Sequence, residues 1–325
     1  MPEFIERLMD SRKALNLPFP GTVEHISREV QMDVQLTRQM FTGIKADITK
    51  IGGISPAVFH MTHSFSSGSQ MLPPYSLGAA FATNRIFMNG NVDNDGSVSG
   101  RFHYGWSPEN ARHTTKIQTQ TTAEPGQSML QVEHDWKGDD FSINLKTVNP
   151  SFLDGEFSAV SIAHYLQSVT PSLALGVEAI WQKPPSTAGP EETSLSYVGR
   201  YVQPTWIASA QVSPQGVLGM CFWKKLSQKV EAGVECQLIS ATGPMGQTKT
   251  EGTTTLAAKY DYLHSTLRGQ LDTKGKLSCL FEKRLSGAVS LTFAGTLDHF
   301  KNDAKVGLGV NLEMPAFDDP SMMQQ

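Results

Sequence analysis

The sequence predicts an all-β protein in which most of the chain forms one antiparallel meander of strands. From about residue 40 onward, apolar and polar residues alternate in short runs, and this period of two is typical of a strand with one apolar face. Turn-forming residues separate the runs, and no helical pattern falls between them. Because parallel neighbours need crossover segments, we expect the strands to pair antiparallel in chain order.

Two helical patterns precede the strands. Residues 3–15 carry an apolar stripe that ends before the prolines of "NLPFPG". A second stripe follows the candidate N-cap Thr22 at steps of three and four residues: Val23, Ile26, Val30 and Val34. This stripe predicts an amphipathic helix over 22–38. A helix packed on a core is one explanation of it; inside a pore, the stripe would pack against the inner wall because it would otherwise face water.

The strand pattern is clearest in five runs, which are "GIKADITKI" (43–51), "SVSGRFHYGW" (97–106), "MLQVEHDW" (129–136), "LALGVEAIW" (173–181) and "KVGLGVNL" (305–312). The clearest predicted turns are "DNDG" (93–96), "KGDD" (137–140), "PQG" (214–216) and "DTKGK" (272–276). We count roughly eighteen or nineteen runs of about ten residues, the length that a tilted membrane-spanning strand needs.

Uniform alternation favours a membrane barrel over a large soluble β protein, which remains the alternative. In a soluble sheet of this size, some strands would be buried on both faces and would read as continuous apolar runs. A propeller would also show a repeat, and none is present. Aromatic residues near the ends of runs are candidates for the two interfacial girdles of a barrel: Tyr75, Trp106, Trp136, Trp181, Tyr201, Trp206 and Trp223.

Composition excludes several other classes. The 325 residues are 39 % apolar with a net charge of −4, and no run approaches the ~18 apolar residues of a membrane helix. The opening "MPEFIERLMD" lacks the basic region and apolar core of a secretory signal. No Lys/Arg block points to nucleic acid. The three widely spaced cysteines form neither a disulfide framework nor a CxxC metal site.

No catalytic residue, metal site or cofactor is predicted. His60 and His63 in "HMTH" are three residues apart, which places them on opposite faces of a strand. "DNDG" lacks the later ligands of a calcium loop. Neither a phosphate-binding glycine loop nor a nucleophile elbow is present. We therefore expect a protein that is not an enzyme.

Four stretches carry a resemblance to a known family: "DDFSINLKTVNPSFLDGEF" (139–157), "CFWKKL" (221–226), "EGTTTLAAKYDY" (251–262) and "STLRGQLDTKGKLSCLFEKRL" (265–285). They resemble the channel-forming subunit of the protein translocase of the mitochondrial outer membrane, the TOM complex, in its fungal form. This family is a branch of the eukaryotic mitochondrial porin superfamily, and the likeness runs from about residue 4 to residue 313. It implies a barrel of about nineteen strands, with parallel first and last strands and the N-terminal helical segment inside the pore.

The resemblance also implies a function. The protein would be integral to the mitochondrial outer membrane and would pass unfolded precursor proteins from the cytosol to the intermembrane space. Its partners would be precursor proteins, the central receptor subunit and small single-helix subunits of the TOM complex, a second copy of the channel subunit, and membrane lipids, without nucleic acid or cofactor. An anion-selective metabolite porin is the first alternative, and a soluble β-scaffold is the second.

Three regions follow from this interpretation. Residues 1–39 would form the N-terminal helical segment, 40–313 the barrel and 314–325 a short tail, with strands at about 40–51 and 303–313 closing the barrel. Pro315 and Pro320 argue against a long helix in the tail. Members of the family often carry a longer N-terminal extension, which is consistent with a truncated N-terminus in this chain.

Six acidic residues fall on the predicted inner face of the barrel: Asp47, Glu133, Asp135, Glu178, Glu231 and Glu235. Mitochondrial targeting segments are amphipathic and rich in Arg, so these carboxylates are candidates for a presequence path made of many weak contacts. Basic residues share the same predicted face: Lys45, Arg101, Lys146, Arg200, Lys259 and Arg268. Because any aqueous wall is polar, the pattern alone does not separate a presequence path from an ordinary wall.

The last run suggests an assembly signal. Lys305, Gly307, Val310 and Leu312 resemble the C-terminal sorting signal that outer-membrane assembly machinery reads in mitochondrial barrel precursors. A terminal strand with free backbone groups can pair with an exposed strand edge of that machinery. The alternative is an ordinary closing strand.

Overall fold

The structure, a computed structural model, describes residues 15–54, 56–69, 72–107, 112–122, 128–151, 157–184, 190–242 and 248–314. The helix predicted over 3–15 lies outside these ranges except for its last residue, and so does the tail after residue 314. Within the described ranges, none of the helices has the length and apolar character needed to cross a membrane.

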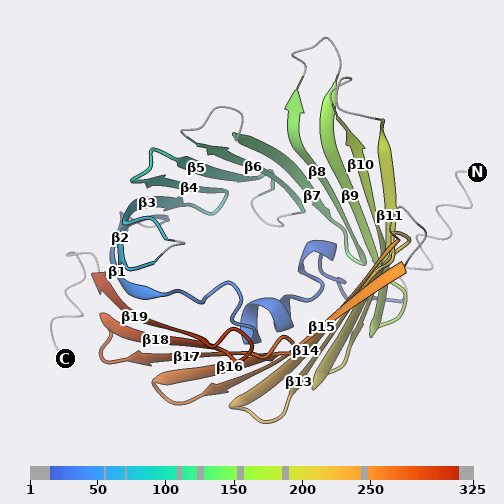
Figure 1. Cartoon of the computed structure of the whole chain (residues 1–325). Helices are drawn as coiled ribbons and strands as arrows, with labels where there is room; N and C mark the ends of the chain where they lie inside the picture. Colours follow the sequence, from blue (N-terminus) through green and yellow to red (C-terminus); the bar gives the residue numbers. More distant parts are fainter. Residues whose placement is uncertain are drawn as a thin grey trace, which may run out of the picture.

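Nineteen strands follow one another around a closed barrel (Figure 1). They are β1 (Gly43–Ile54), β2 (Ala57–Ser67), β3 (Tyr75–Ala82), β4 (Ile86–Asp93), β5 (Val98–Gly105), β6 (His113–Thr121), β7 (Met129–Lys137), β8 (Phe141–Ser151), β9 (Ser158–Ser168), β10 (Leu173–Lys183), β11 (Glu192–Val202), β12 (Trp206–Ser213), β13 (Val217–Lys225), β14 (Val230–Thr242), β15 (Thr248–Asp261), β16 (Ser265–Asp272), β17 (Lys276–Arg284), β18 (Val289–Asp298) and β19 (Asp303–Met314).

The barrel closes by pairing its first and last strands in parallel. Every other neighbouring pair is antiparallel and consecutive in the chain, whereas β1 and β19 run side by side with Gly43 opposite Gly307 and Lys50 opposite Met314. When an odd number of strands alternate in direction, the first and the last run the same way. They can therefore close the barrel only as a parallel pair. The predicted barrel with parallel closure is therefore confirmed, with β1 beginning at Gly43 rather than at residue 40. The four predicted turns join β4–β5, β7–β8, β12–β13 and β16–β17.

The inner and outer faces follow from the register, because directly paired residues point to the same side of a sheet. On β14, Gly233 lies under Val30 of the N-terminal segment, and Glu235 accepts hydrogen bonds from that segment. This set of residues therefore faces the lumen. The opposite set, continued around the barrel by the register, is largely apolar and exposed, and includes Leu145, Leu175, Leu256 and Phe293. An apolar outer belt of this kind is what a lipid-facing barrel requires.

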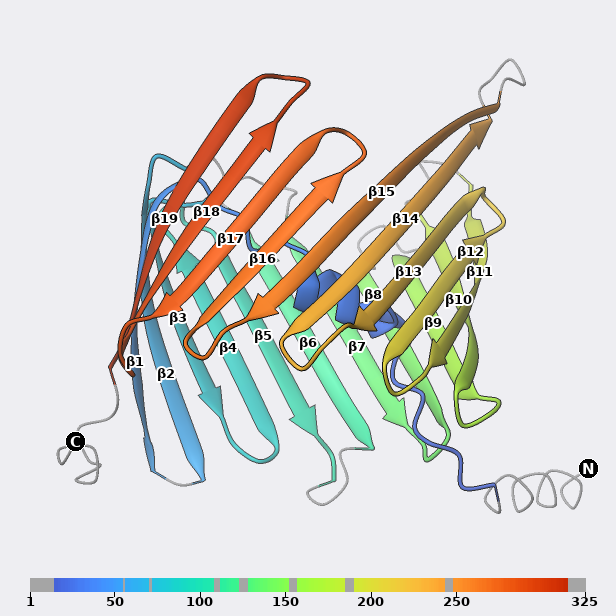
Figure 2. The same cartoon turned by 90° about the horizontal axis from the view of Figure 1, so that it is seen from below.

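The two ends of the barrel differ in what they carry. We call the end with the β1–β2 connection and the end of β19 at Met314 the terminal rim, and the end where β1 begins the opposite rim. The N-terminal segment enters at the terminal rim, where the Ser168 hydroxyl at the end of β9 donates to the Pro18 carbonyl at 2.7 Å. It then crosses the lumen to reach the opposite rim at Gly43 (Figures 1 and 2).

The helix predicted over 22–38 is shorter and of a different type. The segment forms a 3₁₀ turn, η1 (Val23–His25), and a π-helix, η2 (Glu29–Val34), in which Gln35 N–H donates to the Val30 carbonyl. β-Branched residues favour an α-helix only weakly, and the barrel wall supplies alternative hydrogen-bond partners for this segment. The tertiary contacts therefore override the α-helical periodicity of the sequence.

Aromatic residues form belts at both rims of the outer face. Trp106, Trp136, Tyr201 and Trp206 point outward near the terminal rim, and Tyr75 and Trp181 near the opposite rim. Tyr201 and Trp206 stack with ring centroids 5.2 Å apart.

The assignment of Trp223 to a girdle was wrong. It pairs with Gly233 and Ile207 and so faces the lumen, where its Nε1–H is buried without a partner in the described structure. Nearness to a strand end suggested the girdle, but the side on which a residue lies depends on register.

Candidate functional site

The N-terminal segment, residues 18–41, lies against one side of the lumen and divides the inner surface into two parts. We call the inner face of β8–β19 the covered wall, because the segment contacts it. We call the inner face of β2–β5 the open wall, which lies across the lumen from η2 (Figure 1). The lumen, with these two walls, is the candidate functional site.

Two apolar clusters fix the segment to the covered wall. Val23 and Ile26 pack with Leu166, Ala174 and Val198 from β9, β10 and β11. Farther along the segment, Leu36 packs with Leu280, Ala294, Met40 and Phe41. Between the clusters, Val30 is 2 % exposed and sits over Gly233, where an added Cβ would lie 3.2 Å from a Val30 methyl group. Burying each large apolar side chain contributes about 1.5–3 kcal/mol, so the stripe anchors the segment strongly.

Polar contacts along the segment complement these clusters. The amides of Gln31 and Gln35 both donate to the Glu235 carboxylate, at 2.8 and 2.6 Å. Glu29 forms an ion pair with Arg200 at 2.5 Å. The Leu36 N–H donates to the Gln270 side chain at 2.8 Å, and Arg268 donates to Gln39. Each hydrogen bond to a charged group contributes about 1.5–3 kcal/mol, and together they set the position of the segment along β11–β16.

All six acidic residues that the sequence placed in the lumen lie on the inner face, and most of them have partners within the barrel. Asp47 pairs with Lys45 at 2.8 Å. Glu178 accepts from His164 at 2.8 Å and from Gln211 at 3.0 Å. Glu235 holds the segment as described above, whereas Glu231 is half-buried opposite Lys259 with no hydrogen bond or ion pair in the described structure. The predicted acids therefore differ in how free they are to bind a substrate.

Glu133 and Asp135 belong to a buried ionic network. Lys116 lies between them, with its Nζ 2.8 Å from one carboxylate and 2.7 Å from the other. The Asn144 amide donates to both carboxylates, at 2.6 and 2.5 Å, and its carbonyl faces His164. Because each carboxylate residue is only 4 % exposed, removal of the lysine would leave buried negative charges without compensation. The network connects β6 to β12 through His164, Glu178 and Gln211.

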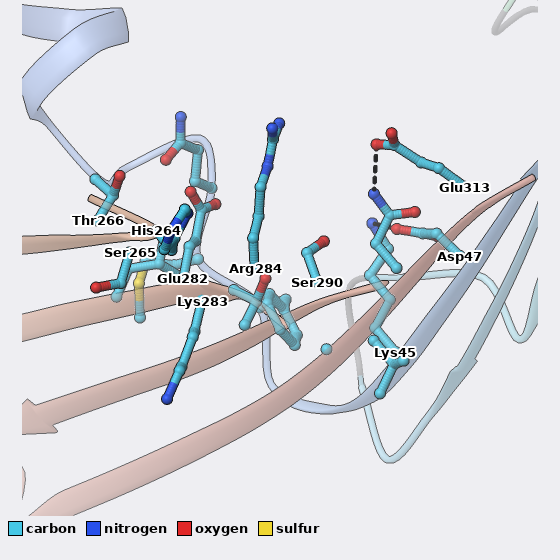
Figure 3. Close-up of a pocket in the computed structure, with 18 of the residues that line it drawn as sticks. Lys45, Asp47, His264, Ser265, Thr266, Glu282, Lys283, Arg284, Ser290 and Glu313 are labelled. Atoms are coloured by element: carbon cyan, nitrogen blue, oxygen red, sulfur yellow. Dashed lines mark hydrogen bonds and ion pairs between the residues drawn. The ribbon is translucent and has the colours of Figure 1, made fainter. Parts of the chain in front are cut away.

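A recess of about 700 Å³ opens between the segment and strands β1 and β16–β19, toward the terminal rim. Its lining carries charges of both signs, with Lys45 and Arg284 near Asp47, Glu282 and Glu313 (Figure 3). Glu313 accepts a hydrogen bond from Asn311 at 3.3 Å. This mixture gives the recess no single sign of charge, so it does not favour anions or cations by pairwise contacts alone.

The proposed signal residues lie at the parallel seam. Lys305 and Gly307 face the lumen, and Val310 and Leu312 face outward. An added Cβ on Gly307 would lie 2.6 Å from the Phe41 carbonyl oxygen, and one on Gly309 would lie 3.0 Å from the Phe41 ring. These glycines therefore have a packing role, since they let Phe41 approach the seam closely.

Several residues that build the inner wall or hold the N-terminal segment were not predicted from the sequence. Lys116, Asn144 and His164 complete the ionic network, and Gln270 and Phe41 hold the segment. Gly307 and Gly309 alternate on the polar face of the last run, a pattern that permits close approach of another group, but nothing in the sequence identified Phe41 as that group. Among the described residues, no group of three or more His, Cys, Asp or Glu is arranged to hold a metal ion.

The family model and the related sequences that match this chain agree on one family. The eukaryotic porin family model matches residues 19–307. The chain is 48 % identical over 307 residues to the mitochondrial import receptor subunit tom40 of Neurospora crassa, covering 94 % of this chain and 86 % of that protein. It is 43 % identical over 334 residues to TOM40 of Saccharomyces cerevisiae, covering 98 % of this chain and 84 % of that protein.

More distant matches include the Homo sapiens TOM40 homolog, at 27 % identity over 307 residues, with 91 % of this chain and 79 % of that protein covered. A solved structure of a mutant Rh. blastica porin aligns with a TM-score of 0.44 at 9 % identity, covering 83 % of this chain and 96 % of that chain. On the sequence matches, the chain belongs to the eukaryotic porin family and, within it, to the Tom40 import receptor subunits.

Proposed function

We propose that this protein is the protein-conducting channel of the mitochondrial outer membrane and passes unfolded precursor proteins from the cytosol to the intermembrane space. The observation that carries this conclusion is its 48 % identity to an import receptor subunit over 94 % of the chain. The closed barrel agrees with it, because an apolar outer belt around a polar inner face suits an integral membrane channel. This interpretation fits the relatives better than an anion-selective metabolite porin does.

The same relatives support partners for the chain. Their names describe an import receptor subunit, and we propose that this chain assembles into the TOM complex with a central receptor subunit, small single-helix subunits and a second copy of itself. Within the chain, residues 1–39 would serve as the pore segment, 40–313 as the barrel and 314–325 as a tail.

The acidic presequence path is a further part of the proposal, and the contacts described above sharpen it. Asp47 and Glu231 are the predicted acids best placed to contact a passing basic side chain, because the first has a single exchangeable ion-pair partner and the second has none in the described structure. Glu133, Asp135 and Glu178 would have to release Lys116 or His164 first. Weak and separate contacts of this kind favour transit over trapping.

Import into mitochondria tests the proposed function. Mitochondria in which this chain is the sole channel subunit should import a presequence-bearing precursor, and the chain should remain in the membrane pellet after alkaline carbonate extraction. In planar bilayers, the purified barrel should prefer cations, and an Arg-rich presequence peptide should block its current. An anion-selective pore that such a peptide does not block would instead support the metabolite porin, and release by carbonate would contradict membrane integration.

The path itself is tested by the double variant Asp47→Asn with Glu231→Gln, which keeps the shape of both side chains. Import of a presequence-bearing precursor should slow, and each exposed contact should contribute about 1 kcal/mol or less. The matched control is Glu251→Gln on the same inner face near the opposite rim. Unchanged import by the double variant, with normal assembly of the barrel, would contradict a path through these two carboxylates.

A further inference from the structure

The hairpin of β14 and β15 extends past the strand that follows it. β15 pairs with β14 from Thr248 onward, but it pairs with β16 only from Thr255 onward. Residues 248–253 of β15 therefore have a strand on one side only. Figure 2 shows β15 continuing at the opposite rim beyond the end of β16. This stretch is an edge strand, and a shorter one lies at the same rim on β11, where residues 192–196 have no partner on β12.

At this edge, the backbone groups of alternate residues point away from β14. Thr254 N–H donates to the Thr273 hydroxyl at 2.9 Å, and its carbonyl accepts from Thr273 N–H at 3.0 Å, so the backbone of residue 254 faces the β16 side. Successive residues of a strand alternate in this respect. The N–H and carbonyl groups of Thr250 and Gly252 therefore face the same way, and no strand of the described chain pairs with them.

The position of this edge relative to the membrane follows from its backbone. A tilted strand spans the bilayer with about 9–11 residues, whereas β15 has 14 and β16 has 8. Unpaired N–H and carbonyl groups are not tolerated in hydrocarbon. The edge at residues 248–253 therefore lies in water, above the membrane surface, at the mouth of the barrel.

A recess lies directly inside this edge. It has a volume of about 360 Å³ and is lined by Thr253, Glu235 and Asp272 on the wall and by Gln31 and Arg38 on the N-terminal segment. A chain held at the edge would therefore lie at the entrance of a polar cavity that leads along the covered wall.

We propose that the β15 edge at Thr250 and Gly252 binds an extended segment of an entering polypeptide by adding it to the sheet as a further strand. The proposal rests on the proposed function, because an unfolded precursor supplies the extended chain. Strand addition recognises main-chain groups and leaves alternate side chains free. This form of recognition suits a channel whose substrates share no sequence, since the backbone hydrogen bonds are the same for all of them.

Thr250→Pro is the direct test, because proline removes the N–H that faces the open edge and leaves the pairing with β14 intact. Capture of a presequence-bearing precursor, arrested in the channel by a folded C-terminal domain, should weaken about fivefold for the loss of one hydrogen bond. A photoreactive residue at position 250 should crosslink to the extended segment of the same arrested precursor.

Two controls separate the edge from unrelated effects. Thr250→Val loses the hydroxyl that contacts Ser240 at 3.0 Å but keeps the N–H, and it should capture the precursor normally. Thr193→Pro makes the same change near the opposite rim on β11, which pairs with β12 only from Tyr197, and it should also capture normally. Assembly of each variant is verified by its size in mild detergent.

The outcomes are distinct. Normal capture by Thr250→Pro, or no crosslink from position 250 while the precursor still enters, would overturn strand addition and leave the channel function standing. Equal losses in Thr250→Pro and Thr193→Pro would also overturn it, because any rim proline would then have the same effect. Failure of the unsubstituted chain to import any precursor would instead overturn the proposed function.

Discussion

The covered wall and the open wall belong to one barrel and share one alternating pattern, yet their inner residues differ in burial and in charge. Strand residues with less than a tenth of their surface exposed occur from β7 to β19, and none of the described residues of β1–β6 reaches that level. On the described inner face of β2–β4, Asp93 is the one formally charged residue, whereas β7–β11 carry a dense ionic network.

The difference shows that local alternation decides which side of a strand faces the lumen. Contact with the N-terminal segment, or with the ionic network around Lys116, decides which of these inner residues become buried. Where the segment lies, small wall residues such as Gly233, Ala174 and Ala294 make room for it. Opposite the segment, many inner residues of β2–β4 are small, such as Ser64, Gly78 and Asn91, and none of the described ones is buried. We therefore expect the covered wall to tolerate substitution poorly and the open wall to tolerate it well.

Removal of residues 1–38 should have the largest effect, because it exposes both apolar clusters of the covered wall at once. The single-channel conductance should rise, since the lumen then loses the segment that narrows it. The control is removal of residues 1–14 alone, which leaves the contacts of residues 18–41 in place. Equal conductance of the two shortened chains would place the functional constriction elsewhere in the barrel.

Lys116→Met should lower the free energy of unfolding by about 3–5 kcal/mol, because Glu133 and Asp135 then stay buried without a cation. Denaturant titration of the barrel in detergent micelles, followed by tryptophan fluorescence, measures this change. The matched variant on the open wall is Arg101→Met, which loses one exposed hydrogen bond to Gln118 and should cost about 1 kcal/mol or less. Similar losses for both would remove the distinction between the buried network and the open wall.

The contacts of Glu133, Asp135 and Glu235 change how a charge-reversal variant at these three positions must be interpreted. The sequence pattern alone suggests that reversal of all three would slow import and leave the barrel assembled. Their partners are Lys116, Asn144, Gln31 and Gln35, so we expect reversal to destabilise the barrel as well. A defect in import by that variant is therefore informative only beside a measurement of its stability.

Gly233→Leu and Gly78→Leu place the same side chain on the two walls. At Gly233 the new Cβ lies 3.2 Å from Val30, whereas at Gly78 its nearest neighbour is Asn91 Oδ1 at 3.5 Å, an ordinary contact. Overpacking should destabilise the first variant by about 1–3 kcal/mol. It should also speed tryptic cleavage at Arg28, because the segment is displaced. If both variants resist trypsin equally, Val30 does not anchor the segment.

Leu312→Gln should have the smallest effect on the finished barrel and still test the proposed assembly signal. Leu312 faces outward, away from Phe41, so this change avoids the close contact that makes any substitution of Gly307 hard to interpret. Precursors of Leu312→Gln should accumulate at an early assembly stage on native gels. Leu297→Gln makes the same outward change on β18, and equal assembly of both variants would leave β19 without a special signal.

The alternation of the sequence determined the strands, their antiparallel order, their turns and the face on which each acidic residue lies. These are local properties, because a side chain at position i points opposite to its neighbour whatever the rest of the chain does. Asp47 and Glu235 could therefore be placed in the lumen before the fold was known. The parallel closure was implied by the family resemblance, since the runs alone gave roughly eighteen or nineteen strands.

The tertiary structure decided which of these residues are available to a substrate. Lys116 reaches Glu133 and Asp135 because strand register brings β6 beside β7, and Trp223 faces the lumen because of its place in β13. The π-helix and the approach of Phe41 to Gly307 depend on where the N-terminal segment settles across the barrel. Register and long-range packing join residues far apart in the chain, and a local pattern of polar and apolar residues carries no record of those pairings.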